Sequence, residues 1–217
     1  MKIERDFVYD PSLVLYLPFR ELDGGSFRSR DAYGHLCTNN GATWNLNGLK
    51  FDGVDDYIDC GTGNSLNLTN ALTLEAWIEL QTNLVANGYI LSRNLSSGLV
   101  VQYSLWVTSG IPEVQVGLEN LIWDTNYVSP LNNTHLVFTF QSPNHLLYSD
   151  GVLRASQISA RTLTSQNYRF LLGARDNTGA TQTLFLKGAI ALVRIYNRAL
   201  NANEIRRLYE STKWRFK

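Results

Sequence analysis

Hydrophobic and polar residues alternate in short runs along most of the chain, and Gly, Asn, Asp or Pro separates one run from the next. Alternation with a period of two is typical of strands that bury one face, and regularly spaced short strands indicate an antiparallel sandwich or jelly roll. We therefore predict an all-β fold with two antiparallel sheets. The predicted strands are LVLYLPF (13–19), LKFDG (49–53), DYIDCG (56–61), LTLEAWIEL (72–80), YILSR (89–93), LVVQYSLWV (99–107), EVQVGLE (113–119), HLVFTFQ (135–141), HLLYSDG (145–151), YRFLLGA (168–174) and LFLKGAIALVRIY (184–196).

The run 72–80 shows the alternation most clearly. Successive strand residues point to opposite sides of a sheet, so this run has one fully apolar face and one mixed face. The apolar face carries Leu72, Leu74, Ala76, Ile78 and Leu80, and the mixed face carries Thr73, Glu75, Trp77 and Glu79. In the run 135–141, His135 shares the polar side with Thr139, which is typical of a histidine on a strand surface.

The end of the chain predicts a short helix in LNANEIRRLYE (200–210). Asn201 stands three residues before Glu204, which is the spacing of a capping box, and an apolar stripe follows. The tail STKWRFK (211–217) alternates basic and aromatic residues, and we expect either a frayed terminus or a docking segment there.

In this order and spacing, LVLYLPF, FDGVDDYIDCG, LTLEAWIEL, LLYSDGVL, FLLGA and GAIALVRIYNRALNANEI resemble the laminin-G-like, concanavalin A-like jelly rolls. VRIYNRALNANEI is the most specific part. The resemblance implies two stacked, curved antiparallel sheets with a concave face, in a superfamily of lectins, adhesion domains, carbohydrate-binding modules and some glycosidases. We expect a single domain over 1–217, with its core at 12–209 and a tail at 211–217.

Four aspartates crowd into FDGVDDYIDCG (51–61), namely Asp52, Asp55, Asp56 and Asp59. Asp-Gly and Asp-Asp pairs are turn chemistry, because an Asp side chain accepts hydrogen bonds from backbone N–H groups two residues on. An EF-hand calcium loop needs alternate acidic residues and a late Glu, which this stretch lacks. We predict a turn, with a metal site and an acid/base pair as alternatives.

The family resemblance also implies a place for a structural calcium. It would use Asp31 and an acidic residue after the G-x-I of the last strand, but that position is Ala191 here. We therefore expect no metal and no cofactor.

Catalytic patterns are weak. Glycosidases place two carboxylates about 5–10 Å apart. Glu75 and Glu79 would lie about 13 Å apart on one strand. No nucleophile or phosphate-binding motif is present in the sequence. We expect a protein that is not an enzyme.

Nineteen basic and nineteen acidic residues cancel, so charge gives no reason to expect nucleic acid as a partner. The N-terminus MKIERDFVYD has no apolar signal-peptide core, and no run is long enough to insert into a membrane. We expect a location on a virion surface or outside the cell. Cys37 and Cys60 lack metal-site spacing and predict either two buried thiols or a disulfide.

Sugar recognition needs aromatic faces with polar groups beside them. Covering one aromatic face contributes about 2.5 kcal/mol, whereas a millimolar complex needs about 4 kcal/mol, so at least two aromatic residues must converge. Packing of Trp106 and Trp123 in the core or at its rim is the alternative. The candidate ligand-binding residues are Trp123, Asp124, Asn126, Tyr127, Tyr103 and Trp106.

Two functions remain. The first is a lectin-like binding or adhesion module whose partner is a glycan or cell-surface carbohydrate. The second is a structural assembly protein, such as a virion decoration or tail component, whose partners are copies of itself or other virion proteins. Adhesion of a virus particle to its host would combine both functions.

Overall fold

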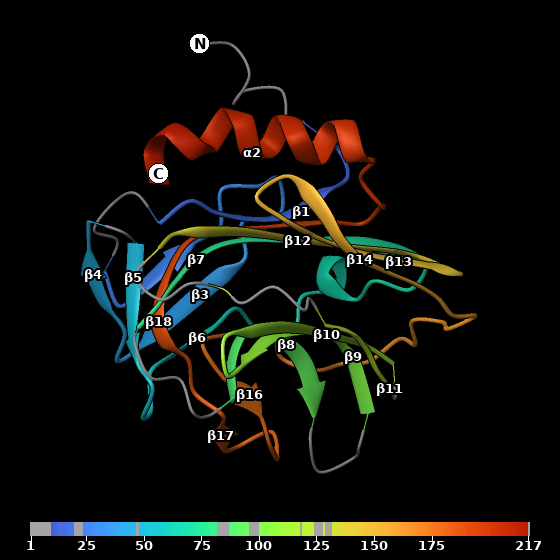
Figure 1. The fold of residues 1–217 in the computed structure, drawn as a ribbon. Helices are drawn as coiled ribbons and strands as arrows, with labels where there is room; N and C mark the ends of the chain where they lie inside the picture. Colours follow the sequence, from blue (N-terminus) through green and yellow to red (C-terminus); the bar gives the residue numbers. More distant parts are fainter. Residues whose placement is uncertain are drawn as a thin grey trace.

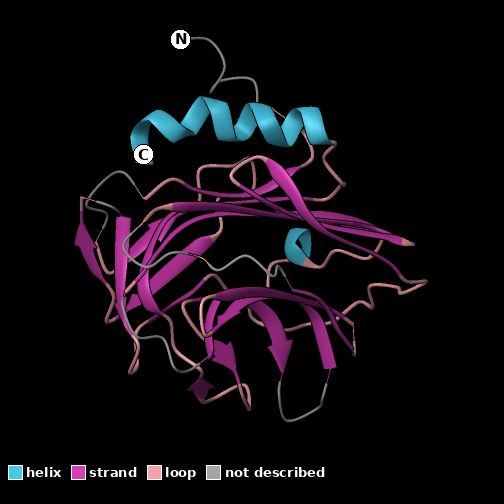
Figure 2. Ribbon diagram, in the orientation of Figure 1, coloured by secondary structure: helices cyan, strands magenta, loops and turns pink. Residues whose placement is uncertain are grey.

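The computed structural model describes residues 10–19, 24–46, 48–81, 87–95, 100–117, 119–123, 128 and 132–216. Two antiparallel sheets lie face to face, and the long helix α2 (Ala202–Phe216) crosses the outer side of one of them (Figure 1). Strands dominate the rest of the molecule (Figure 2). The predicted all-β sandwich with a C-terminal helix is confirmed.

We call the sheet under α2 the back sheet and the other one the front sheet. In spatial order, the described strands of the back sheet are β14 (Val152–Ile158), β13 (Asn144–Ser149), β12 (Thr134–Gln141), β7 (Ala71–Leu80), β18 (Lys187–Tyr196), β5 (Gly48–Asp52) and β4 (Thr43–Asn45), while β1 (Leu13–Leu17) also pairs with β18. Those of the front sheet are β11 (Glu119–Trp123), β10 (Ile111–Val116), β9 (Val100–Thr108), β8 (Asn87–Leu95), β15 (Leu171–Leu172), β6 (Tyr57–Asp59), β3 (Leu36–Asn40) and β2 (Ser26–Arg28). The hairpin of β16 (Arg175–Asp176) and β17 (Gln182–Thr183) and the short 3-10 helix η1 (Asn64–Leu66) complete the described elements.

The main core fills the space between the sheets. All five apolar residues predicted to share one face of β7 are buried in it. From the front sheet, Leu105, Val107, Val114 and Val116 enter the same core at every second position of β9 and β10. The period-two pattern therefore identified the inward face of β7 correctly, and β9 and β10 bury alternate residues in the same way.

A second apolar cluster lies between the back sheet and α2. Trp77 of β7 packs there with Ile205, Leu208 and Phe216 of the helix. Ile205, Leu208, Thr212 and Phe216 are buried at spacings of three and four residues, which form one stripe of a helix. The helix continues through Phe216, whereas the sequence pattern predicted its end at residue 210, so residues 211–216 are not a frayed tail.

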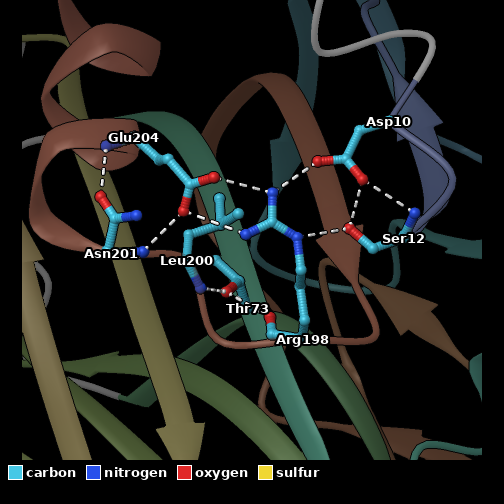
Figure 3. A network of polar contacts seen from close by, with 7 residues as sticks. All are labelled: Asp10, Ser12, Thr73, Arg198, Leu200, Asn201 and Glu204. Carbon is cyan, nitrogen blue, oxygen red and sulfur yellow. Dashed lines mark hydrogen bonds and ion pairs between the residues drawn. The ribbon is translucent and has the colours of Figure 1, made fainter.

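The predicted capping box is confirmed (Figure 3). The backbone N–H of Glu204 donates to Oδ1 of Asn201 at 3.0 Å, and the N–H of Asn201 donates to Oε2 of Glu204 at 2.8 Å. The Arg198 guanidinium also bridges Glu204 and Asp10, which attaches the start of the helix to the segment before β1.

Gly48 stands where β5 begins beside β18. Its φ is +120°, and a Cβ there would lie 2.4 Å from the carbonyl oxygen of Ile190. Only glycine combines this dihedral angle with so close an approach. The residue lets β5 occupy the side of β18 that β1 occupies further along.

Candidate functional site

A row of side chains crosses the front sheet on the face that points away from the core. Tyr89 of β8 lies opposite Trp106 of β9, and Trp106 lies opposite Glu113 of β10. Directly opposed residues of antiparallel strands share a face. Both neighbours of Trp106 in the chain, Leu105 and Val107, point into the core, so Trp106 points outward.

Tyr89 and Trp106 form the floor of this face. Their rings are stacked, with centroids 5.3 Å apart and planes 15° from parallel. Each side chain is only 4% exposed. The indole N–H of Trp106 donates to Oγ1 of Thr108 at 3.2 Å. The pair is thus fixed in one orientation, and its neighbours offer the more accessible groups.

Arg175 of β16 adds a cation to the row. Its guanidinium carbon lies 5.7 Å from the centre of the Tyr89 ring, within the range of a cation–π contact. Burial raises the pKa of Tyr89, Arg175 opposes that rise, and Glu113 adds to it. The side chains of Arg175 and Glu113 thus flank the aromatic pair and are themselves half-buried.

Ion pairs hold the β16–β17 hairpin, which carries Arg175, against the front sheet. Arg169 binds Asp176 at 3.0 Å through Nε and Asp59 at 3.0 Å through Nη1. Asp176 also accepts the backbone N–H of Gly179 at 2.7 Å. Because Asp59 belongs to β6, these contacts connect the hairpin to the front sheet.

The structure separates the predicted ligand-binding residues. Trp123 occupies the register position opposite Glu113, so its backbone continues the row from Trp106 by two strands. Asp124, Asn126 and Tyr127 lie outside the described residues.

Tyr103 has a different place. It is fully buried between the sheets, and its hydroxyl donates to the carbonyl oxygen of Leu66 at 2.8 Å. The ligand-binding role of all six predicted residues stays a prediction. Sequence reasoning missed Tyr89, Glu113 and Arg175, although the first two lie in runs that it predicted as strands, because pairing across strands is not visible in one sequence.

Three of the four aspartates accept backbone hydrogen bonds, as the prediction of a turn requires. Oδ1 of Asp52 accepts the N–H of Val54 at 2.7 Å, and Oδ1 of Asp59 accepts that of Gly61 at 2.8 Å. Oδ2 of Asp56 accepts the N–H of Asp52 at 2.9 Å. The hydrogen bond from Val54 is the main cause that lowers the pKa of Asp52, whereas burial raises the pKa of Asp56. Oxygens of Asp52, Asp55 and Asp56 come within 4.8 Å of one another, and those of Asp52 and Asp56 accept backbone N–H groups.

The calcium site implied by the family resemblance lacks suitable donors. Both carboxylate oxygens of Asp31 accept backbone N–H groups, from Tyr16 at 2.9 Å and from Tyr33 at 2.8 Å. Ala191 is buried and offers no side-chain oxygen. Hard cations such as calcium need several oxygen ligands, so this donor set does not fit one.

Cys37 and Cys60 are free thiols in the core, with their sulfur atoms 2.9 Å apart. Thr38 of β3 pairs with Asp59 of β6, so Cys37 and Cys60 are the next residues along these two antiparallel strands. Burial raises the pKa of the Cys60 thiol well above its usual value. A thiol that stays protonated is a poor nucleophile.

A second polar cluster lies on the outer face of the back sheet, beneath α2. Glu75 binds Nη1 of Arg194 at 3.0 Å and Nε2 of His135 at 3.1 Å. All three side chains are at most 1% exposed. The prediction of a surface position for His135 is wrong, because α2 and Trp77 cover it.

The two stacked antiparallel sheets define a jelly-roll sandwich of the lectin and glucanase type. The chain belongs to the concanavalin A-like lectin/glucanases superfamily, because the laminin-G family model of that superfamily matches residues 52–206. No curated protein matches the sequence.

Solved structures share the fold at low identity. Trypanosoma rangeli sialidase in complex with sialic acid is 20% identical, with a TM-score of 0.75 over 96% of this chain and 34% of that chain. The binding domain of Paraclostridial Mosquitocidal Protein 1 is 17% identical, with a TM-score of 0.70 over 92% of this chain and 52% of that chain. The receptor-binding domain of botulinum neurotoxin C/D mosaic serotype is 13% identical, with a TM-score of 0.73 over 92% and 51%. The chain thus spans about a third of the sialidase and about half of the two toxin chains.

The sialidase corrects one expectation. From the sequence we expected a protein that is not an enzyme, but nearly all of this chain matches part of an enzyme chain. At 19–20% identity the likeness shows the fold alone. The spacing of Glu75 and Glu79 is therefore no basis for excluding enzymes as a class.

Among the described helices, none combines the length and the apolar character that crossing a bilayer requires.

Proposed function

We propose that this chain is a carbohydrate-recognition module that binds glycans on the outer face of the front sheet. The observation that carries the proposal is the row formed by Tyr89, Trp106 and Glu113, with Arg175 beside it and Trp123 at the next register position. Tyr89 and Trp106, each 4% exposed, form the rigid floor of the row, and Arg175 and Glu113 beside them are the groups that a sugar hydroxyl can reach.

The spacing of the row suits a ligand longer than one sugar. Neighbouring strands lie about 4.8 Å apart, so Trp106 and Trp123, two strands apart, are separated by about 10 Å. One aromatic face contributes about 2.5 kcal/mol, which is less than a millimolar complex needs. A glycan that reaches from Arg175 along the row to the register position of Trp123 would gain contacts at both ends.

The similar structures support a binding role at the level of the fold. Two of them are named as binding or receptor-binding domains, and a third is a sialidase in complex with sialic acid. The superfamily to which the chain belongs is named for its lectins and glucanases. Recognition of a glycan by this particular chain rests on the row itself.

A glycan array with two matched variants tests the proposal. Trp123→Ala should remove binding to the glycans that the unchanged protein retains, while Trp214→Ala should leave it intact. Trp214 is a suitable control because it is 72% exposed on α2, on the other side of the molecule. Equal binding by the two variants, or no glycan bound by the unchanged protein, would contradict the proposal.

A role in assembly is the second candidate, and β14 favours it. Among the described strands, β14 pairs only with β13, and Val152, Leu153 and Ile158 on it are 52%, 49% and 80% exposed. An apolar edge strand is a template for pairing with another chain. As part of this second proposal, the chain would be displayed on a virus particle as a decoration or tail component, as we expected from the sequence.

Light scattering after size-exclusion chromatography tests this candidate. A stable contact buries at least about 1,000 Å². An oligomer that Ile158→Lys turns into monomers would support the assembly role. A monomer at all concentrations would remove it.

A further inference from the structure

Cys37 and Cys60 face each other across two neighbouring strands of the front sheet. In the antiparallel register of β3 and β6, Asn39 pairs with Ile58 and Thr38 with Asp59, so the two cysteines occupy the next opposed position. Opposed residues of an antiparallel pair have Cα atoms about 4.5–5.5 Å apart. A disulfide requires Cα atoms about 4.4–6.8 Å apart. The backbone therefore holds the two cysteines at a separation that a disulfide can bridge.

The two cysteine side chains also point toward each other inside the main core. Cys37 is 0% exposed and Cys60 is 2% exposed, and both belong to the apolar cluster between the sheets. Their sulfur atoms are in direct contact, 2.9 Å apart, with no other side chain between them. A bond between the sulfur atoms therefore needs the loss of the thiol hydrogens and little movement of the chain.

The chain between the two cysteines visits both sheets. It leaves the front sheet after β3, runs through β4 and β5 of the back sheet, and returns to the front sheet as β6. Cys37 and Cys60 stand at the two ends of this excursion, 23 positions apart in the sequence. A covalent bond that closes a loop of this length reduces the conformational entropy of the unfolded chain. A bond at this place would therefore stabilise the folded sandwich.

The cysteine pair lies where the outermost strands join the front sheet. At this end of the described sheet, β2 pairs with β3, and β3 pairs with β6. The ladder between β3 and β6 consists of only three residue pairs. Short ladders at the edge of a sheet open locally more readily than central strands. A bond from Cys37 to Cys60 would keep β2 and β3 attached to the rest of the sheet.

Burial determines when such a bond can form. Oxidants react with the thiolate, and burial raises the pKa of the Cys60 thiol well above its usual value. In the folded protein the thiols are thus both protonated and out of reach of solvent. In the unfolded chain they are accessible and have ordinary pKa values of about 8.5. Oxidation is therefore expected while the chain folds, and the folded core then protects whichever state has formed.

We propose that Cys37 and Cys60 form a structural disulfide when the chain folds in the presence of a small disulfide such as oxidised glutathione. One cysteine thiolate attacks the oxidant, forms a mixed disulfide and releases one glutathione thiol. The second cysteine attacks the protein sulfur of the mixed disulfide, which forms the Cys37–Cys60 bond and releases the other glutathione thiol. The two cysteines lose two electrons and two protons, which the oxidant takes up. Neither cysteine belongs to the row at Trp106, so this proposal does not depend on glycan binding.

Refolding from denaturant in two buffers tests the proposal. One buffer contains oxidised and reduced glutathione, the other contains dithiothreitol, and the products are compared by intact mass and by thiol labelling after denaturation. The product from glutathione should be a single chain that is lighter by two hydrogen atoms and has no thiol to label. The product from dithiothreitol should keep both thiols. Free thiols, glutathione adducts or disulfide-linked dimers as the main product from glutathione would overturn the proposal.

Thermal unfolding of the two products measures the effect of the bond on stability. The disulfide form should have a Tm about 5–10 °C higher than the dithiol form, because the bond closes a loop that spans both sheets. Cys60→Ala is the matched control, and its Tm should be the same after refolding in either buffer. Equal Tm values for the two forms of the unchanged protein, or an equal rise in the variant, would contradict the stabilising role. The mass measurement uses the unchanged protein and does not depend on the folding of the variant.

Hydrogen exchange locates the effect within the fold. Amides of β2 and β3 should exchange at least about tenfold more slowly in the disulfide form, whereas those of β14, at an edge of the back sheet, should exchange at the same rate in both forms. No slowing in β2 and β3, or equal slowing in β14, would contradict a bond that acts at this edge. Oxidised glutathione added to the folded dithiol form should leave both thiols free until denaturant is added. Rapid oxidation without denaturant would contradict the protection by burial.

Discussion

The outer faces of the two sheets carry similar residues but use them differently. On the back sheet, Glu75 and Arg194 are buried and neutralise each other, and Glu75 also binds His135, whose ring lies against Tyr209 of α2. On the front sheet, Glu113 and Arg175 flank an aromatic pair and stay half-buried. Charged groups that a helix covers contribute to the stability of the fold, whereas charged groups at the edge of solvent remain available to a ligand. The same residue types therefore have opposite expected roles on the two faces.

The same substitution, Glu to Gln, made on each face tests this comparison most strongly. Glu75→Gln should lower the free energy of unfolding by about 3–5 kcal/mol, because it leaves Arg194 buried without its counter-charge. Glu113→Gln should change the unfolding free energy by less than about 0.5 kcal/mol and should weaken glycan binding. Chemical denaturation measures both values. Equal losses of stability would show that the two faces do not differ.

The pH dependence of stability sharpens the same contrast. Burial alone would raise the pKa of Glu75, but Arg194 and His135 outweigh it and lower the pKa below its ordinary value of 4.5. A lowered carboxyl pKa stabilises the folded state above the unfolded-state pKa, and this contribution is lost as the pH falls through the folded-state pKa. The unfolding free energy should therefore decline below pH 4.5, and the decline should be shallower in Glu75→Gln. Identical slopes for the two proteins would contradict this assignment.

The contact between α2 and the back sheet should show an intermediate effect. The indole N–H of Trp77 donates to Oγ1 of Thr212 at 2.9 Å, and both residues are buried. Thr212→Val keeps the shape but leaves the indole N–H without an acceptor, which should cost about 1–3 kcal/mol. Ser211→Ala, on the neighbouring residue, is the control. Thermal unfolding should place Thr212→Val clearly below this control, and equal midpoints would show that the bond does not stabilise the helix.

The smallest effect is expected where the helix begins. Arg198 binds both Asp10 and Glu204, but its side chain is 38% exposed (Figure 3). Ion pairs that contact solvent contribute about 1 kcal/mol or less and are screened by salt. Arg198→Gln should therefore lose about 1 kcal/mol at low ionic strength, and less in 1 M salt. A loss of unfolding free energy that does not change with salt would indicate that hydrogen bonds and packing, not charge, stabilise the start of α2.

Local patterns in the sequence predicted the parts of the fold that depend on neighbours in the chain. The alternation of Leu72 and Leu74 with Thr73 and Glu75 identified the inward face of β7, and the Asn201–Glu204 spacing identified the start of α2. The aspartate turns were also predictable, because Asx bonds connect residues two positions apart.

Features that depend on distant residues were missed. His135 was expected on the surface, since nothing in its own strand shows that α2 covers it. The outward row needs the register of β8, β9 and β10, which a single sequence does not reveal. Tyr103 and Trp106 are close in the chain but lie on opposite faces of β9, so nearness along the sequence was a poor guide to a shared site.

Mapping of a bound glycan by NMR tests the central claim most directly. Isotope-labelled protein would be titrated with the glycan that binds best on the array, and the amide shifts would be compared between the two outer faces. We expect shifts along β8, β9, β10 and β11 and none along α2 or β13. Shifts confined to α2 and the back sheet would contradict recognition by the front sheet.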